Sequence, residues 1–458
     1  MKRLLAICLL GCAALPAQQP PAATELPGSP FFIKKTWIIG GVGNWDYLTM
    51  DAAAQRLYIA HGAQVQVVDV ETGQVAGVIS GLREAHAIAL DDTGQFGYIS
   101  DGPAGEVKVF DRRTLAVVAT VSTGPAPRAL VYEPQNRLLF AVCANPSEEN
   151  PPQPAGSPGR TPSNASARAP ASNAPSGTAA DEQIKSSITV IDAETRQKLG
   201  VILMPGRLGF AEADGRGQVF FNIVSRNQIA RLDAQSIAAL LGSPAARTAT
   251  AQTPATQKIS TQTTARKPAA GRHSSVPAHP APPGPATEDA APPVLDWSHE
   301  SRLPSSAENR MSLLAVGADC RELSALAVDG AHTRLFAACG NMKMLVLNGG
   351  TGELVTTLPI GPGTEAIGYD AGRGLIYTAN GGAQGTVTII RQDVTDTYSE
   401  IQNLATRQRA RTLAVNPATG QVYLVTDLVG VKLDQPGSIG TLQTQSVKGS
   451  FQVLVIGN

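Results

Sequence analysis

Apolar residues along most of this chain fall in short runs that end at polar turn residues. The clearest stretch reads AHAIALDD (85–92), FGYISD (96–101), EVKVFD (106–111) and LAVVATV (115–121). Short runs of this kind predict β-strands. The turns between them, DDTG, DGPAG and DRRT, contain the Asp and Gly residues that tight reversals favour. The pattern therefore predicts a small antiparallel sheet of four strands.

The same unit recurs seven times with a constant internal spacing. A polar or small leading residue opens the first strand of each unit, and a closing residue ends the second strand fifteen positions later, as from 46 to 61. The leading residues are Asp46, His86, Arg128, Gly209, Ser324, Glu365 and Arg411, and the closing residues are His61, Asp101, Cys143, Val224, Cys339, Asn380 and Thr426. Units that cannot bury a core alone stack on their neighbours. We therefore predict an all-β, seven-bladed β-propeller of four-stranded antiparallel blades.

The ends of the chain predict how the ring closes. The seventh unit has two strands followed by a Gly-rich loop and one last strand, FQVLVIG (451–457), so it lacks an outer strand. The segment KTWIIGG (35–41) precedes the first leading residue and fits that place. We expect the two segments to pair, which removes free sheet edges.

Two stretches interrupt the β pattern. Residues 145–184 fall between strands two and three of the third blade, and residues 242–310 between strands three and four of the fourth. Both are rich in Pro, Ala, Ser and Thr, and Trp297 is their one aromatic residue. Such compositions bury too little apolar surface to offset chain ordering, so we predict disordered insertions in a propeller that spans 35–458.

The N-terminus predicts export. Lys2 and Arg3 precede an apolar run from Leu4 to Leu15, which suits a signal peptide over residues 1–17 followed by a linker over 18–34. An alternative is a lipobox ending at Cys12, whose lipidation would anchor the protein. No apolar run is long enough to span a membrane. We expect a periplasmic or secreted protein, or a lipoprotein anchored at Cys12.

Three cysteines remain after residue 17. Cys320 lies four residues before the leading residue Ser324, and Cys339 closes the same unit, so the two are expected near one sheet edge. A Cys320–Cys339 disulfide suits an exported protein. Alternatively, Cys143, Cys320 and Cys339 are three buried thiols.

Charge and missing motifs narrow the function. The 37 basic and 37 acidic side chains cancel, which disfavours nucleic acid as a partner. The chain has no GxSxG, GxxxxGK[ST], GxGxxG, CxxCH or CxxC motif, so common hydrolase, kinase and cytochrome classes lose support. We expect a monomer that is a binding or scaffold protein rather than an enzyme.

The second strands carry a family resemblance. IYTANGG (376–382), with YIAHG and YISDG, resembles the YVTN motif, and the period of about 40 residues resembles YVTN-repeat and YncE-like seven-bladed propellers. The resemblance implies the propeller fold and a place in the cell envelope. Related propellers include lactonases and surface-layer proteins, so it also implies a lactonase-like hydrolase as the alternative function. Cys or Asp replaces the last Asn of the motif in several units.

The leading residues form the candidate ligand site. In a propeller the first strands are innermost, so leading residues are expected around one channel mouth. Five neighbouring units carry ionisable ones, and the predicted ligand-binding residues are Asp46, His86, Arg128, Glu365 and Arg411. Arginines bind carboxylate or phosphate in a forked geometry, which suits a small polar or anionic ligand or an envelope protein. Alternatively, these charges only satisfy one another.

Catalytic and metal roles are the weaker hypotheses for this mouth. His86 and Glu365 are the candidate catalytic residues of the hydrolase alternative. No cofactor is predicted, but a divalent metal would suit oxygen and imidazole ligands gathered from several blades. The candidate metal ligands are Asp46, His61, His86, Asp101 and Glu365. Trp45, beside Asp46, either walls the pocket or packs between blades.

Overall fold

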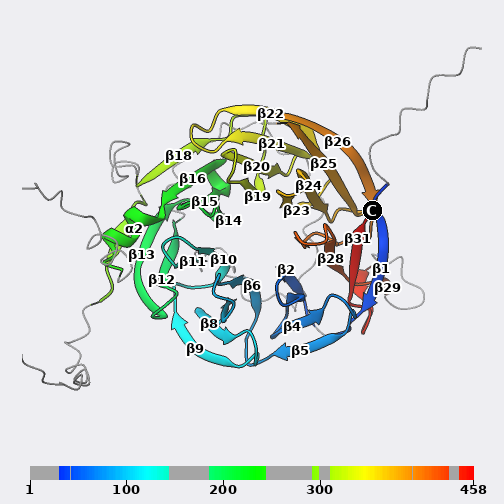
Figure 1. The fold of residues 1–458 in the computed structure, drawn as a ribbon, viewed down its shortest axis with the longest axis horizontal. Helices are drawn as coiled ribbons and strands as arrows, with labels where there is room; N and C mark the ends of the chain where they lie inside the picture. Colours follow the sequence, from blue (N-terminus) through cyan, green and yellow to red (C-terminus); the bar gives the residue numbers. More distant parts are fainter. Residues whose placement is uncertain are drawn as a thin grey trace, which may run out of the picture.

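The protein is a closed ring of seven sheets in a computed structural model (Figure 1). The structure describes residues 30–41, 43–143, 185–243, 291–298, 310–394, 396–432 and 443–458. Each sheet is built on four antiparallel strands, and the first strand of every blade lies nearest the centre. The seven-bladed propeller prediction is confirmed.

The first three blades each take their four strands in chain order, with a long segment between the second and third strands of blade 3. Blade 1 contains β2 (Trp45–Asp51), β3 (Arg56–His61), β4 (Gln64–Asp69) and β5 (Val75–Ile79). Blade 2 contains β6 (Ala85–Leu90), β7 (Phe96–Asp101), β8 (Glu106–Asp111) and β9 (Val117–Ser122). Blade 3 contains β10 (Pro127–Glu133), β11 (Leu138–Cys143), β12 (Lys185–Asp192) and β13 (Gln197–Pro205).

The remaining blades repeat the arrangement. Blade 4 contains β14 (Leu208–Ala213), β15 (Gln218–Ile223), β16 (Gln228–Asp233) and β18 (Met311–Ala315), with η2 (Val224–Arg226) after β15 and α2 (Ala234–Leu240) after β16. Blade 5 contains β19 (Leu323–Asp329), β20 (Arg334–Cys339), β21 (Lys343–Asn348) and β22 (Leu354–Pro359). Blade 6 contains β23 (Thr364–Asp370), β24 (Leu375–Asn380), β25 (Thr386–Val394) and β26 (Thr397–Ala405).

Blade 7 joins the two ends of the chain. Its strand order is β27 (Leu413–Val415), β28 (Val422–Thr426), β31 (Gln452–Gly457) and β1 (Phe32–Ile38), and β1 pairs antiparallel with β31. A hairpin of β29 (Val429–Lys432) and β30 (Gln443–Ser446) lies between β28 and β31 in sequence. The closure prediction is confirmed, although β1 begins at Phe32, inside the stretch we expected to be a linker.

The core lies between the blades. Seven clusters of buried side chains each combine residues of two neighbouring blades. The second strands are mostly apolar and buried, as in β11 (LLFAVC), and the third strands are buried at most of their apolar positions. Because a strand presents alternate residues to its two faces, each of these strands packs against both neighbours. Burial on both faces explains why these runs are continuously apolar.

Part of the second predicted insertion is ordered. Residues 291–298 include β17 (Val294–Asp296), which pairs in parallel with β13 of blade 3, and Trp297 packs into the core between blades 3 and 4. The low average apolar content of 242–310 predicted disorder throughout. One buried Trp holds more apolar area than several small residues, so Trp297 alone can order the segment around it. Most of both insertions, the predicted signal peptide and Cys12 lie outside the described residues.

Blade 4 departs from the constant spacing. Leu208, which precedes the leading residue, pairs with Ile223, and the N–H of Val224 donates to the carbonyl of Arg207. In other blades that bond is made by the residue after the closing residue, as from Gly62 to Asn44. The true closing residue of blade 4 is therefore Ile223 rather than Val224. Its β14–β15 turn is one residue shorter, with Gly215 and Gly217 at positive φ.

Candidate functional site: the channel mouth

A β-bulge positions the leading residue in six blades. The register of the inner pair shifts between Trp45 and Leu48, between Ala85 and Ile88, and at the matching places in blades 3, 4, 5 and 6. A bulge leaves an extra residue unpaired and redirects its side chain. In each case the leading residue lies in the shift, which frees it from the packing that constrains the rest of the strand. This explains why its identity varies.

Two charge pairs form between leading residues of neighbouring blades. His86 Nδ1 lies 2.9 Å from Asp46 Oδ2, which joins blades 1 and 2. Arg411 Nε lies 3.0 Å from Glu365 Oε2, which joins blades 6 and 7. The first pair is the more enclosed, since the His86 side chain is 9% exposed and that of Glu365 is 49% exposed. The carboxylate at Nδ1 holds the proton on that nitrogen when the ring is neutral.

Tyr47 marks the centre of this cluster. Burial raises the pKa of its hydroxyl far above the ordinary value, and the charges of Asp46 and Glu365 raise it further, while Arg411 and Arg128 lower it. All four charged residues therefore act on one side chain. Four of the five predicted ligand residues, Asp46, Arg128, Glu365 and Arg411, thus lie within electrostatic range of Tyr47, and the fifth, His86, contacts Asp46.

Two aromatic rings meet across the channel next to the leading residues. The rings of Tyr47 in blade 1 and Phe210 in blade 4 lie 5.3 Å apart in an edge-on contact. Blades 2 and 3 separate these two blades on one side of the ring, so the contact crosses the central channel. The charged leading residues are therefore followed in sequence by an aromatic contact that narrows the channel. Sequence reasoning missed Tyr47 and Phe210, which follow Asp46 and Gly209 in the sequence.

Glu212 is a further acidic residue that sequence reasoning missed. It lies two positions after Phe210 on the same face of β14 and is half-buried. Its side chain makes no hydrogen bond or ion pair with the other described residues. Burial raises the pKa of its carboxyl from 4.5 to about 7. The channel thus holds a carboxyl that changes charge near neutral pH.

Two closing residues, His61 and Asp101, are buried and bonded to other groups of the protein. His61 is buried, with Nδ1 2.7 Å from Gln66 Oε1 and its ring packed on Phe451. Asp101 accepts hydrogen bonds from the backbone N–H groups of Arg83 and Glu84. These two candidate metal ligands instead fasten the segments that lead into the inner strands. Among the described residues, no three His, Cys, Asp or Glu side chains are grouped to hold a metal ion.

Trp45 packs between blades rather than lining the mouth. It is 4% exposed, its ring lies 5.3 Å from that of Phe451, and the Arg409 guanidinium lies 4.6 Å from its centre. Arg409 also pairs with Asp427 at 2.9 Å. The packing alternative for Trp45 is therefore correct.

Of the two alternatives for the cysteines, the structure contains the disulfide. Cys320 and Cys339 form a disulfide at the start of blade 5. Cys143 is a free, buried thiol, and burial raises its pKa. No helix within the described part of the chain has the length and apolar character needed to cross a bilayer.

Comparison with known proteins supports the fold. No known family profile matches the chain, and no curated protein sequence matches it. A chain in the crystal structure of the mitotic checkpoint complex is similar at 12% identity and TM-score 0.53, over 92% of this chain and 95% of that one. U3-55K has 7% identity and TM-score 0.53, over 91% and 97%. The WD40 repeats of RRP9 have 7% identity and TM-score 0.54, over 92% and 96%. At these identities the chain shares with them the WD40-like seven-bladed propeller fold.

Proposed function

We propose that this protein is an exported binding module of the bacterial cell envelope, and that its channel mouth binds a small polar or anionic ligand. The observation that carries the proposal is the charged cluster around Tyr47. Charged pairs join blades 1 and 2 and blades 6 and 7, and the charges of Asp46, Glu365, Arg411 and Arg128 all act on Tyr47, whose ring contacts Phe210. Apolar contact beside a few convergent polar groups is what ligand sites combine.

Export is supported by two independent features. The chain begins with a basic, apolar and small-residue segment typical of a signal peptide. The Cys320–Cys339 disulfide suits an oxidising compartment, because cytosolic proteins are kept reduced. We place the protein in the periplasm or outside the cell, with lipidation at Cys12 as the alternative.

Membership of the YVTN-repeat, YncE-like propellers is part of the same proposal. It rests on the second strands, of which β24 (LIYTAN) is the closest to the motif. Asn380, the last residue of that motif, has its carboxamide oxygen near Thr364 Oγ1 at 2.6 Å and its amide near Thr388 Oγ1 at 3.0 Å. The motif Asn is thus fully engaged inside blade 6, which suits a structural role in the repeat.

Ligand-dependent stabilisation tests the binding proposal. We expect small carboxylates or phosphates from an anion panel to raise the Tm of the wild-type protein, because a ligand that binds only the folded state stabilises it. Arg411→Ala and Arg128→Ala should each weaken the effect at least about tenfold in apparent Kd, the usual scale for a lost charge-assisted contact. Lys343→Ala in blade 5 is the control, since its pair with Asp319 is exposed and neither residue is a leading residue. If none of the anions raises the Tm, the proposal is wrong.

A turnover assay separates binding from hydrolysis. Asp46 orients His86 as a carboxylate orients a catalytic base, so lactone hydrolysis is the activity to assay. The binding proposal predicts no lactone turnover above that of His86→Ala and Glu365→Ala. Turnover that both substitutions abolish, in variants that keep the wild-type Tm, would favour the lactonase-like alternative instead.

A further inference from the structure

A cavity lies between blades 2 and 3, at the face of the ring opposite the leading residues. It has a volume of about 350 Å³ and is lined from blade 2 by Asp91, Phe96 and their neighbours, and from blade 3 by Tyr132, Arg137 and the turn after β12. Asp91 follows the last residue of β6, whereas His86 lies near its start. Five residues of strand separate the two sites by about 16 Å. None of these lining residues was singled out from the sequence.

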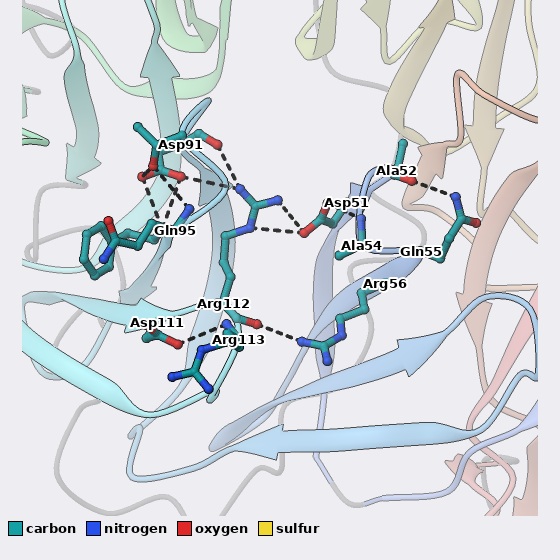
Figure 2. Close-up of polar contacts among 12 residues, drawn as sticks. Asp51, Ala52, Ala54, Gln55, Arg56, Asp91, Gln95, Asp111, Arg112 and Arg113 are labelled. Atoms are coloured by element: carbon teal, nitrogen blue, oxygen red, sulfur yellow. Dashed lines mark hydrogen bonds and ion pairs between the residues drawn. The ribbon is translucent and has the colours of Figure 1, made fainter.

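Among the described charged residues that line this cavity, all but one bind an oppositely charged group or a hydrogen-bond partner. Asp91 accepts hydrogen bonds from the backbone N–H of Phe96 and from Arg112 Nη1 (Figure 2). Arg137 Nη1 pairs with Glu194 Oε2 at 3.1 Å. Arg196 has its guanidinium 4.0 Å from the centre of the Phe96 ring but makes no side-chain hydrogen bond or ion pair with the described residues, and its Nε is buried without an acceptor. Among the described residues that line the cavity, Arg196 is therefore the one cation whose guanidinium has no acceptor.

The repeat shows that Arg196 occupies an unusual place. It lies four residues after Asp192, which starts the turn between the third and fourth strands, and the matching positions in blades 1 and 5 are Gly73 and Gly352. All three have positive φ, at +60° for Arg196, +74° for Gly73 and +78° for Gly352. Residues other than Gly adopt this conformation at a cost of about 1–2 kcal/mol. Strain of this kind at a pocket is a pointer to function.

Blade 2 provides an internal comparison. Leu115 holds the same position there, also at positive φ (+61°), and packs against the apolar cluster between blades 1 and 2. Leucine thus offsets the strain by burying apolar surface. At the next interface Arg196 replaces that apolar contact with a charged group over an aromatic ring. A leucine would satisfy the packing at this position. The guanidinium of Arg196 adds N–H donors that need an acceptor.

We propose that the cavity between blades 2 and 3 binds a small carboxylate with a planar apolar body. The Arg196 guanidinium pairs with the carboxylate, because its N–H groups are the unmatched donors of the site. Phe96 and Tyr132 supply aromatic surface for the body of the ligand. The Tyr132 hydroxyl donates to Asp92 Oδ1 at 2.7 Å, which fixes the position of that ring. This site is independent of the channel mouth and of the function proposed for it.

Benzoate is the probe that tests this proposal, with benzamide as its neutral match and inorganic phosphate as an anion without an apolar body. We expect titration calorimetry on the full chain to show benzoate binding at least about tenfold tighter than either comparison probe, the scale of one charge-assisted contact. Arg196→Leu copies Leu115, and it should weaken benzoate binding at least about tenfold while the Tm without ligand stays at or above the wild-type value.

Three results would overturn the proposal. These are no benzoate binding to the wild-type protein, equal binding to Arg196→Leu, and phosphate binding as tight as benzoate binding. Equal binding in the variant would place benzoate elsewhere, for example at the channel mouth. Arg196→Gly is the second variant, because it restores the residue found at Gly73 and relieves the positive φ. It must keep the fold and lose benzoate binding if the proposal holds.

Discussion

Single glycines decide how the leading side chains lie at the mouth. A Cβ added to Gly102, the residue after the closing Asp101, would lie 2.5 Å from His86 Nε2 and 2.7 Å from its Cδ2. A Cβ added to Gly381 would lie 2.5 Å from the Cβ of Arg411. Neither glycine has a positive φ, so space rather than backbone conformation requires glycine there. The glycine that ends YISDG and YTANG therefore leaves room for the side chain of the leading residue.

Gly102→Ala should displace His86 from Asp46. The ring is almost fully enclosed, so relieving the clash must move it, at a cost of about 1–3 kcal/mol in free energy of unfolding. Urea unfolding gives the cost, and histidine-ring nitrogen NMR shows whether the Nδ1 hydrogen bond is lost. Gly372→Ala is the control, because its added Cβ meets nothing closer than 3.4 Å. An unchanged His86 Nδ1 signal in Gly102→Ala would contradict the packing argument.

Glu212 should make the stability of the protein depend on pH. Its folded pKa of about 7 exceeds the ordinary 4.5, so between these values the unfolded chain is ionised while the folded carboxyl keeps its proton. The stabilising contribution is complete below about pH 4.5 and is lost as the pH rises to about 7. Glu212→Gln should remove this loss and stabilise the protein by up to about 3 kcal/mol at pH 8.

Urea unfolding at a series of pH values measures this effect. Glu400→Gln on the outer strand β26 is the matched control, since Glu400 is exposed. The control should follow the wild-type pH profile. A Glu212→Gln profile that still falls between pH 4.5 and 7 would show that another group is responsible.

At the scale of the element, a carboxylate or carboxamide closes the first hairpin of every blade. Residues five positions after the leading residue accept backbone N–H groups of the next turn, and they are Asp51, Asp91, Glu133, Asp214, Asp329, Asp370 and Asn416. Side-chain acceptors of this kind stabilise tight turns. The sequence contains this second regularity in full. These acceptors lie in the turns, so a prediction based on the apolar runs does not include them.

Arg112 connects two of these acceptors in neighbouring blades. Its Nε lies 3.1 Å from Asp51 Oδ2 of blade 1, a second guanidinium nitrogen also binds that carboxylate, and its Nη1 reaches Asp91 of blade 2 (Figure 2). All three side chains are at most 10% exposed. Arg112→Leu leaves two buried carboxylates without their cation, so it should destabilise the protein by about 3–5 kcal/mol.

Denaturant unfolding checks this value against an exposed pair. Lys343→Ala removes the Lys343–Asp319 contact, whose side chains are 39% and 65% exposed, and should cost about 0–1 kcal/mol. Similar losses for the two variants would mean that Arg112 does not hold blades 1 and 2 together.

The seven-bladed ring was predictable from the sequence because the same pattern of apolar runs and spacing recurs in every blade. Seven hairpin units, their order and their closure follow from apolar runs and spacing, and so does the face shared by the leading residues. The details that shape the mouth depend on contacts across the ring. The Tyr47–Phe210 constriction joins residues far apart in sequence, and the shorter turn of blade 4 moves its closing residue to Ile223.

Closure of the ring depends on both chain ends. Trp37 of β1 stacks on Tyr423 of β28 with ring centres 5.9 Å apart, and Phe31 is buried against Tyr377 of blade 6. The backbone N–H and C=O of Phe31 also bond the Gln402 side chain. Losing a buried aromatic side chain costs about 3–5 kcal/mol. Phe31 is buried and Trp37 is partly buried, so losing both removes a large share of the stability of a typical domain, about 5–15 kcal/mol.

A chain that begins at Ile39 lacks β1 and should therefore not give a cooperative thermal unfolding transition near the wild-type Tm. A chain that begins at Pro30 keeps β1 and is the control. Because the open edge of β31 then has its N–H and C=O groups unpaired, a synthetic peptide of residues 30–38 should bind to it as an added strand and restore the transition. Calorimetry of the shortened chain with and without the peptide decides the point. If the shortened chain unfolds at the wild-type Tm without the peptide, the pairing of β1 with β31 does not hold the ring closed.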